Sequence, residues 1–435
     1  MTHGRAFRFL HASDLLLDQP LASPLGVPPT LRRRLAEAPY RSASAVFAAA
    51  INERVDFVVL SGGLLHLAQA APSEVCFLIE EFNRLHQHGI PVYWAGSVHD
   101  GPASLAAHYR LPANVTHLPI SQAEVPPGSG LVAPAGSAVR APLHTYLVQK
   151  DGEPLARIAG VSRLPHQGLN DLSFHLPRYP SPFTIGLLHV RLDERVDHLG
   201  DLAGVDYWAL GGRMTADESP RGSSLAPVRF AGTPVGRTLE HVTQHGCTLV
   251  EVDQHGVRTR SIATASVAWH LERVEVNLGD TLEMLEKRVL NRCRQILAPP
   301  AAPIDRIVTW RLYGPHAVLH RARVQGWDVQ LTERLQQSHG MATPALWSRA
   351  VELQPAVSVS LDDYPTDSLM AEFLRTARDV QRTEAEKLDL QPYADEAAAS
   401  LPADVSQLDR SRNTVPLLTD AALLGAEYLH GKEVC

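Results

Sequence analysis

Three short apolar runs alternate with two helical patterns near the start of the chain, and this order most restricts its fold. Phe7–Ala12, Asp56–Ser61 and Pro91–Ala95 have the length and composition of buried strands. Between them, residues 41–54 and 73–88 carry apolar side chains at helical spacing. Strands that alternate with helices in this way predict a parallel sheet with crossover helices.

Further apolar runs follow, and together with the first three they predict two packed sheets with helices outside. Strands are expected at 144–149, 155–161, 184–190, 206–210, 229–231 and 247–252. The first two flank the turn at Asp151-Gly152 and should pair antiparallel. Pro126–Ala138 is dense in Pro, Gly and Ser, which predicts a surface loop.

The pattern changes near Ser266. Strands are expected at 271–276, 307–312, 350–353 and 357–361, and helices at 280–297, 329–337, 368–386 and 419–428. We expect a main domain at 1–265, an α+β domain at 266–367 and a helical tail at 368–435. The expected fold class is α/β (α+β): two packed mixed β-sheets flanked by helices, plus a small α+β C-terminal domain.

Composition and charge narrow the function. The formal net charge of -7 does not favour a self-sufficient DNA binder. The four cysteines lack the CxxC spacing of zinc sites, which favours reduced thiols. No apolar run approaches the ~20 residues that span a bilayer, and the first residues do not resemble a signal peptide. We expect a soluble, cytoplasmic protein with no membrane association.

Candidate site residues follow the predicted strands, where ligands gather in open α/β sheets. Ser13-Asp14-Leu15-Leu16 comes after the first strand and Gly62-Gly63-Leu64 after the second. Gly96-Ser97-Val98-His99-Asp100 follows the third. His189 lies at the end of a later strand, and Gly211-Gly212-Arg213-Met214 follows the next.

This series resembles the calcineurin-like metallophosphoesterases, and in particular the SbcD-type DNA repair exonucleases. The family has DxH, GD, GNHD, a single His and GHxH at these places. The matching segments here are HASDLLLD, DFVVLSGGL, GIPVYWAGSVHD, IGLLHV and VDYWALGGRM, followed by AGTPVGR and GCTLVEVD. The resemblance covers residues 7 to about 260 and extends more weakly to the family's DNA-facing capping domain.

The resemblance implies a dinuclear metal site that this chain has largely lost. Asp14 and His189 match surviving metal ligands, and His99 and Asp100 match the family's transition-state histidine and its orienting partner. The positions of lost ligands are Leu16, Gly63, Val98, Gly212 and Met214. Gly63 replaces the carboxylate that bridges the two ions. We therefore expect a pseudoenzyme with no cofactor, and an apolar filling at Leu16, Val98 and Met214.

A rebuilt site is the alternative. His11, Asp18 and His66 lie near the same strand ends and, with Asp14, His99 or His189, would form a mononuclear site for Mn²⁺ or another divalent metal. The protein would then be a metal-dependent phosphodiesterase or exonuclease, a hydrolase. A third reading is a binding role for the cleft, for a nucleotide or a small phosphate.

The resemblance also implies partners. SbcD-type nucleases act with a coiled-coil ATPase of the SMC class, to which a helical segment after the capping domain binds. Here 368–386 and 419–428 are the docking candidates, with apolar side chains at helical spacing. Ordinary packing within the chain explains the same spacing. DNA and a second copy of the chain are further expected partners.

Overall fold

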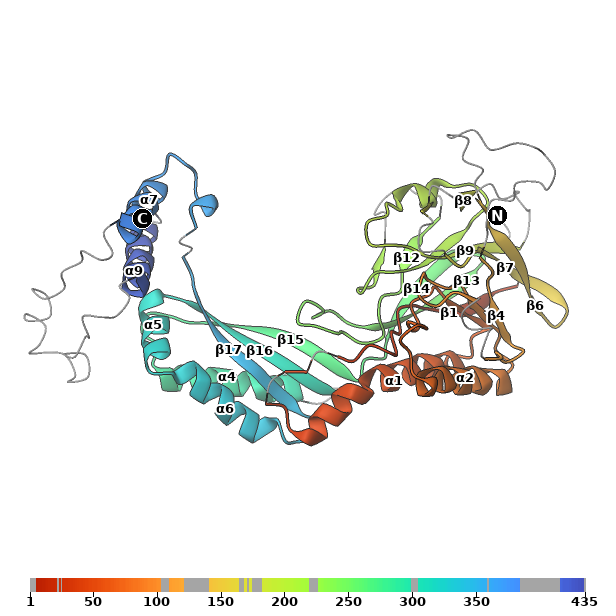
Figure 1. The fold of residues 1–435 in the computed structure, drawn as a ribbon, viewed down its shortest axis with the longest axis horizontal. Coiled ribbons are helices and arrows are strands. Elements are labelled where there is room, and N and C mark those ends of the chain that lie inside the picture. Colours follow the sequence, from red (N-terminus) through yellow and green to blue (C-terminus); the bar gives the residue numbers. More distant parts are fainter. Residues whose placement is uncertain are drawn as a thin grey trace, which may run out of the picture. The chain divides into compact units, whose positions relative to one another are not determined.

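A computed structural model describes most of the chain (Figure 1). The described residues are 5–21, 23–24, 26–102, 109–120, 141–163, 168–169, 172–173, 182–218, 226–298, 304–357, 360–383 and 415–433. The predicted loop Pro126–Ala138 lies outside them. The chain divides into two compact units, one of Met1–His270 with 303–307 and 343–345, the other of the remaining residues. The division into 1–265, 266–367 and 368–435 stays a prediction.

The first six-stranded sheet has the order β14-β13-β1-β2-β3-β4. Its strands are β1 (Phe7–Ala12), β2 (Phe57–Leu60), β3 (Val92–Trp94), β4 (Val115–His117), β13 (Gly246–Asp253) and β14 (Gly256–Ala263). β1 to β4 are parallel, and β13 and β14 are antiparallel. The crossovers are α1 (Pro29–Asn52) and α2 (Pro72–Gln87). The predicted parallel sheet is confirmed, while β4 and β14 were not foreseen.

The second six-stranded sheet has the order β11-β12-β10-β9-β7-β6. Its strands are β6 (His144–Lys150), β7 (Glu153–Gly160), β9 (Phe183–His189), β10 (Tyr207–Gly211), β11 (Asp217–Glu218) and β12 (Val228–Phe230). β6 and β7 form the predicted antiparallel hairpin, whereas β7, β9, β10 and β12 are parallel. A short pair, β5 (Ala141–Pro142) and β8 (Leu172–Ser173), lies outside both sheets.

The two sheets pack face to face through an aromatic core. Along β1, Phe7 and Phe9 belong to the core between the sheets and Leu10 to the core under the helices, as the alternation of side chains in a strand requires. The ring of Phe9 stacks on Phe57, with centroids 5.1 Å apart, and meets Tyr207 of the second sheet edge to face at 5.5 Å. These contacts fix one sheet against the other.

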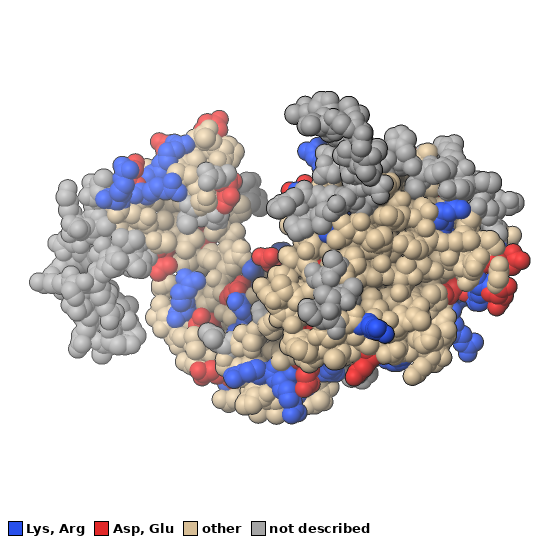
Figure 2. Space-filling model, turned by 45° about the vertical axis from the view of Figure 1, so that its right-hand side comes forward, with Lys and Arg blue, Asp and Glu red and all other residues tan. Residues whose placement is uncertain are grey.

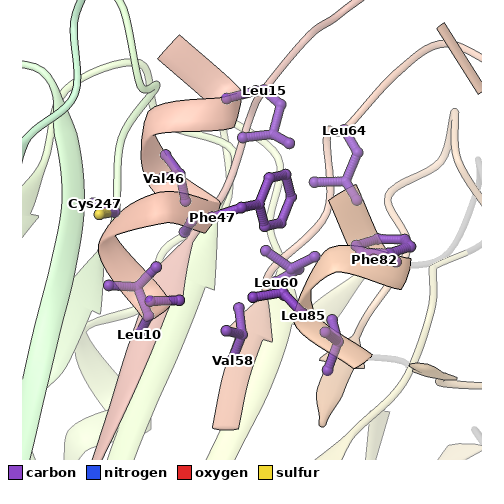
Figure 3. Packing of buried hydrophobic residues seen from close by; sticks show 14 of the residues in the cluster. Leu10, Leu15, Val46, Phe47, Val58, Leu60, Leu64, Phe82, Leu85 and Cys247 are labelled. Carbon is purple, nitrogen blue, oxygen red and sulfur yellow. The ribbon is translucent and has the colours of Figure 1, made fainter. Parts of the chain in front are cut away.

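Helices α1 and α2 cover the outer face of the first sheet (Figure 3). Phe47 from α1 and Phe82 from α2 meet edge to face, with centroids 5.9 Å apart, above Leu60 of β2. Both rings are fully buried. This packing holds the end of β2, and therefore the residues that follow it, in a fixed place.

The second unit is an α+β unit built on the sheet β15-β16-β17. Its strands are β15 (Val267–Glu275), β16 (Asp305–Gly314) and β17 (Leu346–Pro355), and its helices α4 (Leu282–Leu297), α5 (His316–Val324), α6 (Trp327–His339), α7 (Leu369–Thr383) and α9 (Val415–Glu433). The strand predicted at 357–361 is wrong over the described residues, because Leu361–Asp363 forms a 3-10 turn. No helix in the described part of the chain could cross a membrane.

We predict that Phe9→Ala lowers the free energy of unfolding by about 3–5 kcal/mol, because it opens a cavity between the two sheets. Urea denaturation of the purified chain measures this change. Leu147→Ala, at a β6 side chain that is 46% exposed, is the matched control and should cost much less. Equal losses in the two variants would contradict the described core.

Candidate active site

The candidate site lies at the edge where parallel strands of both sheets end. β1, β2 and β3 are parallel in the first sheet, and β9 and β10 in the second, so the residues after them gather at one edge. Asp14 connects the two sheets there. Its Oδ1 accepts a hydrogen bond from Nε2 of His189 at 3.2 Å, and its Oδ2 accepts one from the N–H of Gly212 at 2.8 Å.

The backbone after β1 holds Asp14 in an uncommon conformation. The N–H of Asp14 donates to the carbonyl of Gly62 at 2.9 Å, and that of Leu16 donates to the carbonyl of Gly63 at 3.0 Å. Asp14 and Leu16 have φ angles of 51° and 47°, in the left-handed region that non-glycine residues rarely adopt. Long-range hydrogen bonds therefore position the Asp14 carboxylate over residue 63.

The Asp14 carboxylate takes the space that a side chain at residue 63 would need. A Cβ atom built on Gly63 would lie 2.3 Å from Oδ1 of Asp14, and the φ of Gly63 is +70°. Gly212 is equally restricted: its φ is +100°, and a Cβ atom there would lie 1.8 Å from the carbonyl oxygen of Val190. A side chain at residue 63 would thus require Asp14 to move and a strained backbone, and one at residue 212 is blocked by the backbone of Val190.

His189 forms a partly buried ion pair with Asp14. Burial opposes the charged imidazolium, but the hydrogen bond and the negative charge of Asp14 outweigh burial and raise the pKa of His189. Nε2 of His189 is the donor in this hydrogen bond, because a carboxylate oxygen only accepts. The two surviving ligand positions are brought together, and they bind each other.

Asp100 is fully buried and stabilises the loops after β2 and β3. Its carboxylate accepts hydrogen bonds from the backbone N–H of Leu64 at 2.8 Å and from the backbone and hydroxyl of Ser97. His99 is exposed overall, and the partial burial of its imidazole together with the neighbouring His66 lowers the pKa of that ring. Asp100 raises that pKa only as a nearby charge. The catalytic assignment of this pair stays a prediction.

The apolar substitutions differ in their surroundings. Leu16 is 9% exposed, Val98 is half-buried and Met214 is 37% exposed. The backbone carbonyl of Met214 accepts hydrogen bonds from the N–H and hydroxyl of Thr233. An apolar filling therefore describes Leu16 but not Met214, whose side chain faces solvent.

The three additional candidates from the sequence fall in different places. His11 is fully buried, with Nε2 2.9 Å from Oγ of Ser61 and Nδ1 3.4 Å from the hydroxyl of Tyr207, and burial lowers its pKa to about 3. It is a core histidine. Asp18 accepts a hydrogen bond from the backbone N–H of His66, whose ring lies 4.2 Å from that of His99. The rings of His66 and His99 therefore lie together, in the loops that follow β2 and β3.

The structure places Arg237 at the site, although the sequence analysis assigned no role to this residue. Its buried guanidinium donates to the carbonyls of Leu15, Leu16 and Gln19 in the segment after β1. Burial lowers the pKa of Arg237 to about 10, and the charges of Asp18 and Asp14 oppose that change. A fixed positive charge thus lies near the two carboxylates. In the sequence, the AGTPVGR segment that ends at Arg237 could have pointed to this residue.

A second buried ion pair supports the segment beyond His189. Nη2 of Arg163 donates to Oε1 of Glu194 at 2.8 Å, and Nη1 donates to the carbonyl of His189 at 3.3 Å. Burial opposes ionisation of Glu194, but Arg163 and the N–H groups of Arg191 and Leu169 outweigh it and lower the pKa of Glu194. No sequence motif marked this pair.

The residues at this edge do not fit a pair of metal ions. The candidate donors are Asp14 and His189, and each already binds the other. Space for a bridging carboxylate at residue 63 is taken by Asp14 itself. Among the described residues, no three His, Cys, Asp or Glu side chains at this edge converge as metal ligands.

Comparison with known proteins agrees with the fold. No family model matches the chain. The chain is 26% identical over 339 residues to the "Uncharacterized metallophosphoesterase YhaO" of Bacillus subtilis (strain 168). The aligned region covers 72% of this chain and 75% of that protein. This chain is metallophosphoesterase-like. The match supports the calcineurin-like superfamily; the SbcD-type subgroup and the loss of activity do not follow from it.

Solved structures resemble the chain only at low scores. The protein TT1561 of Thermus thermophilus gives a TM-score of 0.31 at 12% identity, over 59% of this metallophosphoesterase-like chain and 99% of its own. A dimetal phosphatase from Danio rerio gives 0.32 at 14% identity, over 59% of this chain and 98% of its own. Likeness at this level carries no argument about function.

We predict that NMR titration gives His189 a pKa above its usual value of about 6.5, and that Asp14→Asn brings it below that value. Removing the charge of Asp14 leaves burial as the main influence. Because the folded pKa is raised, the pair stabilises the protein fully below about pH 6.5 and loses this contribution as pH rises through the folded pKa. The resonance is assigned by its loss in His189→Gln. An unchanged pKa in Asp14→Asn would contradict the ion pair.

Proposed function

We propose that this chain is a non-catalytic metallophosphoesterase-like protein related to the SbcD-type exonucleases. It acts as a scaffold or regulatory subunit of a coiled-coil SMC-like ATPase, and through that complex it meets DNA. The observation that carries the proposal is the Asp14 carboxylate, which lies where the side chain of residue 63 would have to be.

Electrostatics explain why this one displacement is decisive. Two-metal hydrolysis needs divalent ions about 3.5–4 Å apart that clamp the attacking and leaving oxygens. Such ions repel by roughly 17 kcal/mol at ~4 Å if the effective dielectric is about 20. A bridging carboxylate and several further anions or imidazoles must offset this repulsion. Asp14, the one carboxylate among the surviving ligand positions, is already paired with His189.

The second candidate function is a metal-dependent phosphodiesterase or exonuclease with a rebuilt mononuclear site. The closeness of the His66 and His99 rings favours it, since imidazole is a good ligand for divalent metals. Against it, Asp14 and His189 are hydrogen-bonded to each other, and Asp18 accepts a hydrogen bond from the backbone N–H of His66. The non-catalytic function is therefore the better supported.

The partner proposal rests on α7 and α9. Part of their apolar surface packs within the chain: Met370 and Leu374 are buried with Ala426, and Phe373 contacts Gly425. Another part is exposed, namely Leu369, Leu424 and Tyr428 at 61%, 41% and 70%. Exposed apolar side chains on two paired helices suit a groove or a helix of a partner.

Charge supports a protein partner ahead of direct DNA binding. Figure 2 shows Lys and Arg intermingled with Asp and Glu on the described surface of the face drawn. The formal net charge of -7 works against a phosphate backbone. The mixed surface charge and the negative net charge therefore favour contact with DNA through the ATPase complex over direct binding.

We predict that Mn²⁺ gives no cleavage of linear double-stranded DNA or of bis(p-nitrophenyl) phosphate by the full chain. The variant Gly63→Asp should be less stable than the natural chain and equally inactive, because its carboxylate would collide with Asp14. Cleavage assays and thermal denaturation measure these outcomes. Metal-dependent cleavage that disappears in His189→Ala would overturn the non-catalytic proposal in favour of the rebuilt site.

We predict that the tagged full chain co-purifies with a large coiled-coil ATPase from its native cells. Leu369→Asp combined with Tyr428→Asp should lower the captured amount at least about tenfold, if the two side chains together contribute ~1.4 kcal/mol or more. Leu278→Asp, at an exposed apolar side chain outside α7 and α9, is the matched control. Undiminished capture by the double variant would contradict docking through these helices.

A further inference from the structure

Two histidines and an aspartate converge between α5 and α9, inside the second unit. His316 and His320 are four residues apart on α5, so they lie on the same face of that helix. Asp420 of α9 faces both: its Oδ1 is 3.7 Å from Nε2 of His316 and its Oδ2 is 3.2 Å from Nδ1 of His320. The three ligand atoms lie within 4.8 Å of one another.

Ordinary hydrogen bonding leaves this cluster incompletely satisfied. The side chain of His316 is 5% exposed, and its buried Nδ1 has no hydrogen-bond partner. Nδ1 of His320 is also buried and has no hydrogen-bond partner, although it lies 3.2 Å from Oδ2 of Asp420. A buried ring nitrogen without a partner can offer its lone pair to a metal ion.

The surrounding contacts position these ligands. Glu427, one heptad after Asp420 on α9, accepts a hydrogen bond from the backbone N–H of His316 at the start of α5. Ala426 is fully buried in the small core that α9 shares with α7. These contacts hold the Asp420 face of α9 against the histidine face of α5.

The chemistry favours a metal ion over a simple ion pair. One carboxylate can neutralise only one imidazolium, and two adjacent imidazolium ions repel each other. Neutral imidazole is the form that binds metal ions.

We propose that His316, His320 and Asp420 form a binding site for a divalent transition-metal ion of the zinc class. Zinc bonds of roughly 2.0–2.1 Å in a tetrahedron place ligand atoms about 3.3 Å apart. The separations of 3.2 and 3.7 Å between Asp420 and the two histidines fit this value with small side-chain rotations. Three protein ligands leave one position for water.

The site has a structural consequence that does not depend on the proposed function. The three ligands come from two helices far apart in the sequence, so a bound ion fastens α9 to α5. Because α9 also packs on α7, the ion stabilises the helix pair that carries the exposed apolar side chains. Metal binding and local stability of α9 are therefore linked.

Isothermal titration of the chelator-stripped full chain with Zn²⁺ alone tests the site. We expect one equivalent to bind, and His320→Ala, which removes a partly exposed ligand, to weaken binding at least about 100-fold, beyond the ~10–100-fold cost of losing an outer contact. His430→Ala, at an exposed histidine on α9, is the matched control. His189→Ala should also bind normally, which separates this site from the strand edge.

A second readout guards against effects of the substitutions on folding. Hydrogen exchange of the amides in 415–433 should slow when Zn²⁺ is added to the natural chain and to His430→Ala, and should not change in His320→Ala or Asp420→Asn. Zn²⁺ binding of equal strength in His320→Ala would overturn the proposal. So would binding weaker than about 100 µM in the natural chain, or exchange in α9 that ignores the ion.

Discussion

The hydrogen-bonded ion pair between Asp14 and His189 is the contact on which the rest of the site depends. This ion pair joins the ends of strands from both sheets, and the N–H of Gly212 donates a further hydrogen bond to the Asp14 carboxylate. A buried charge without a partner would lower the stability of the fold, so Asp14 and His189 stabilise each other.

The neighbouring glycines and arginines are consistent with that arrangement. Residue 63 cannot carry a side chain while Asp14 lies across it, and residue 212 cannot carry one beside Val190. Arg237 supplies a fixed positive charge near Asp14 and Asp18. The edge is therefore a polar junction that joins the two sheets.

Much of this could be predicted from the sequence, and the exceptions have physical causes. The apolar runs predicted the two sheets. Asp14 and His189 could be placed at one edge because both lie at the ends of parallel strands, which meet there. The left-handed φ of Asp14 depends on hydrogen bonds to Gly62 and could not be read locally. The Arg163–Glu194 pair and the cluster around Asp420 join distant segments without a motif.

Manganese anomalous diffraction from crystals grown with Mn²⁺ tests the central claim most directly. The account predicts no pair of anomalous peaks beside Asp14 and His189, with the Asp14 carboxylate still lying over Gly63. Two peaks about 3.5–4 Å apart at that edge, with Asp14 and His189 separated to bind them, would contradict it.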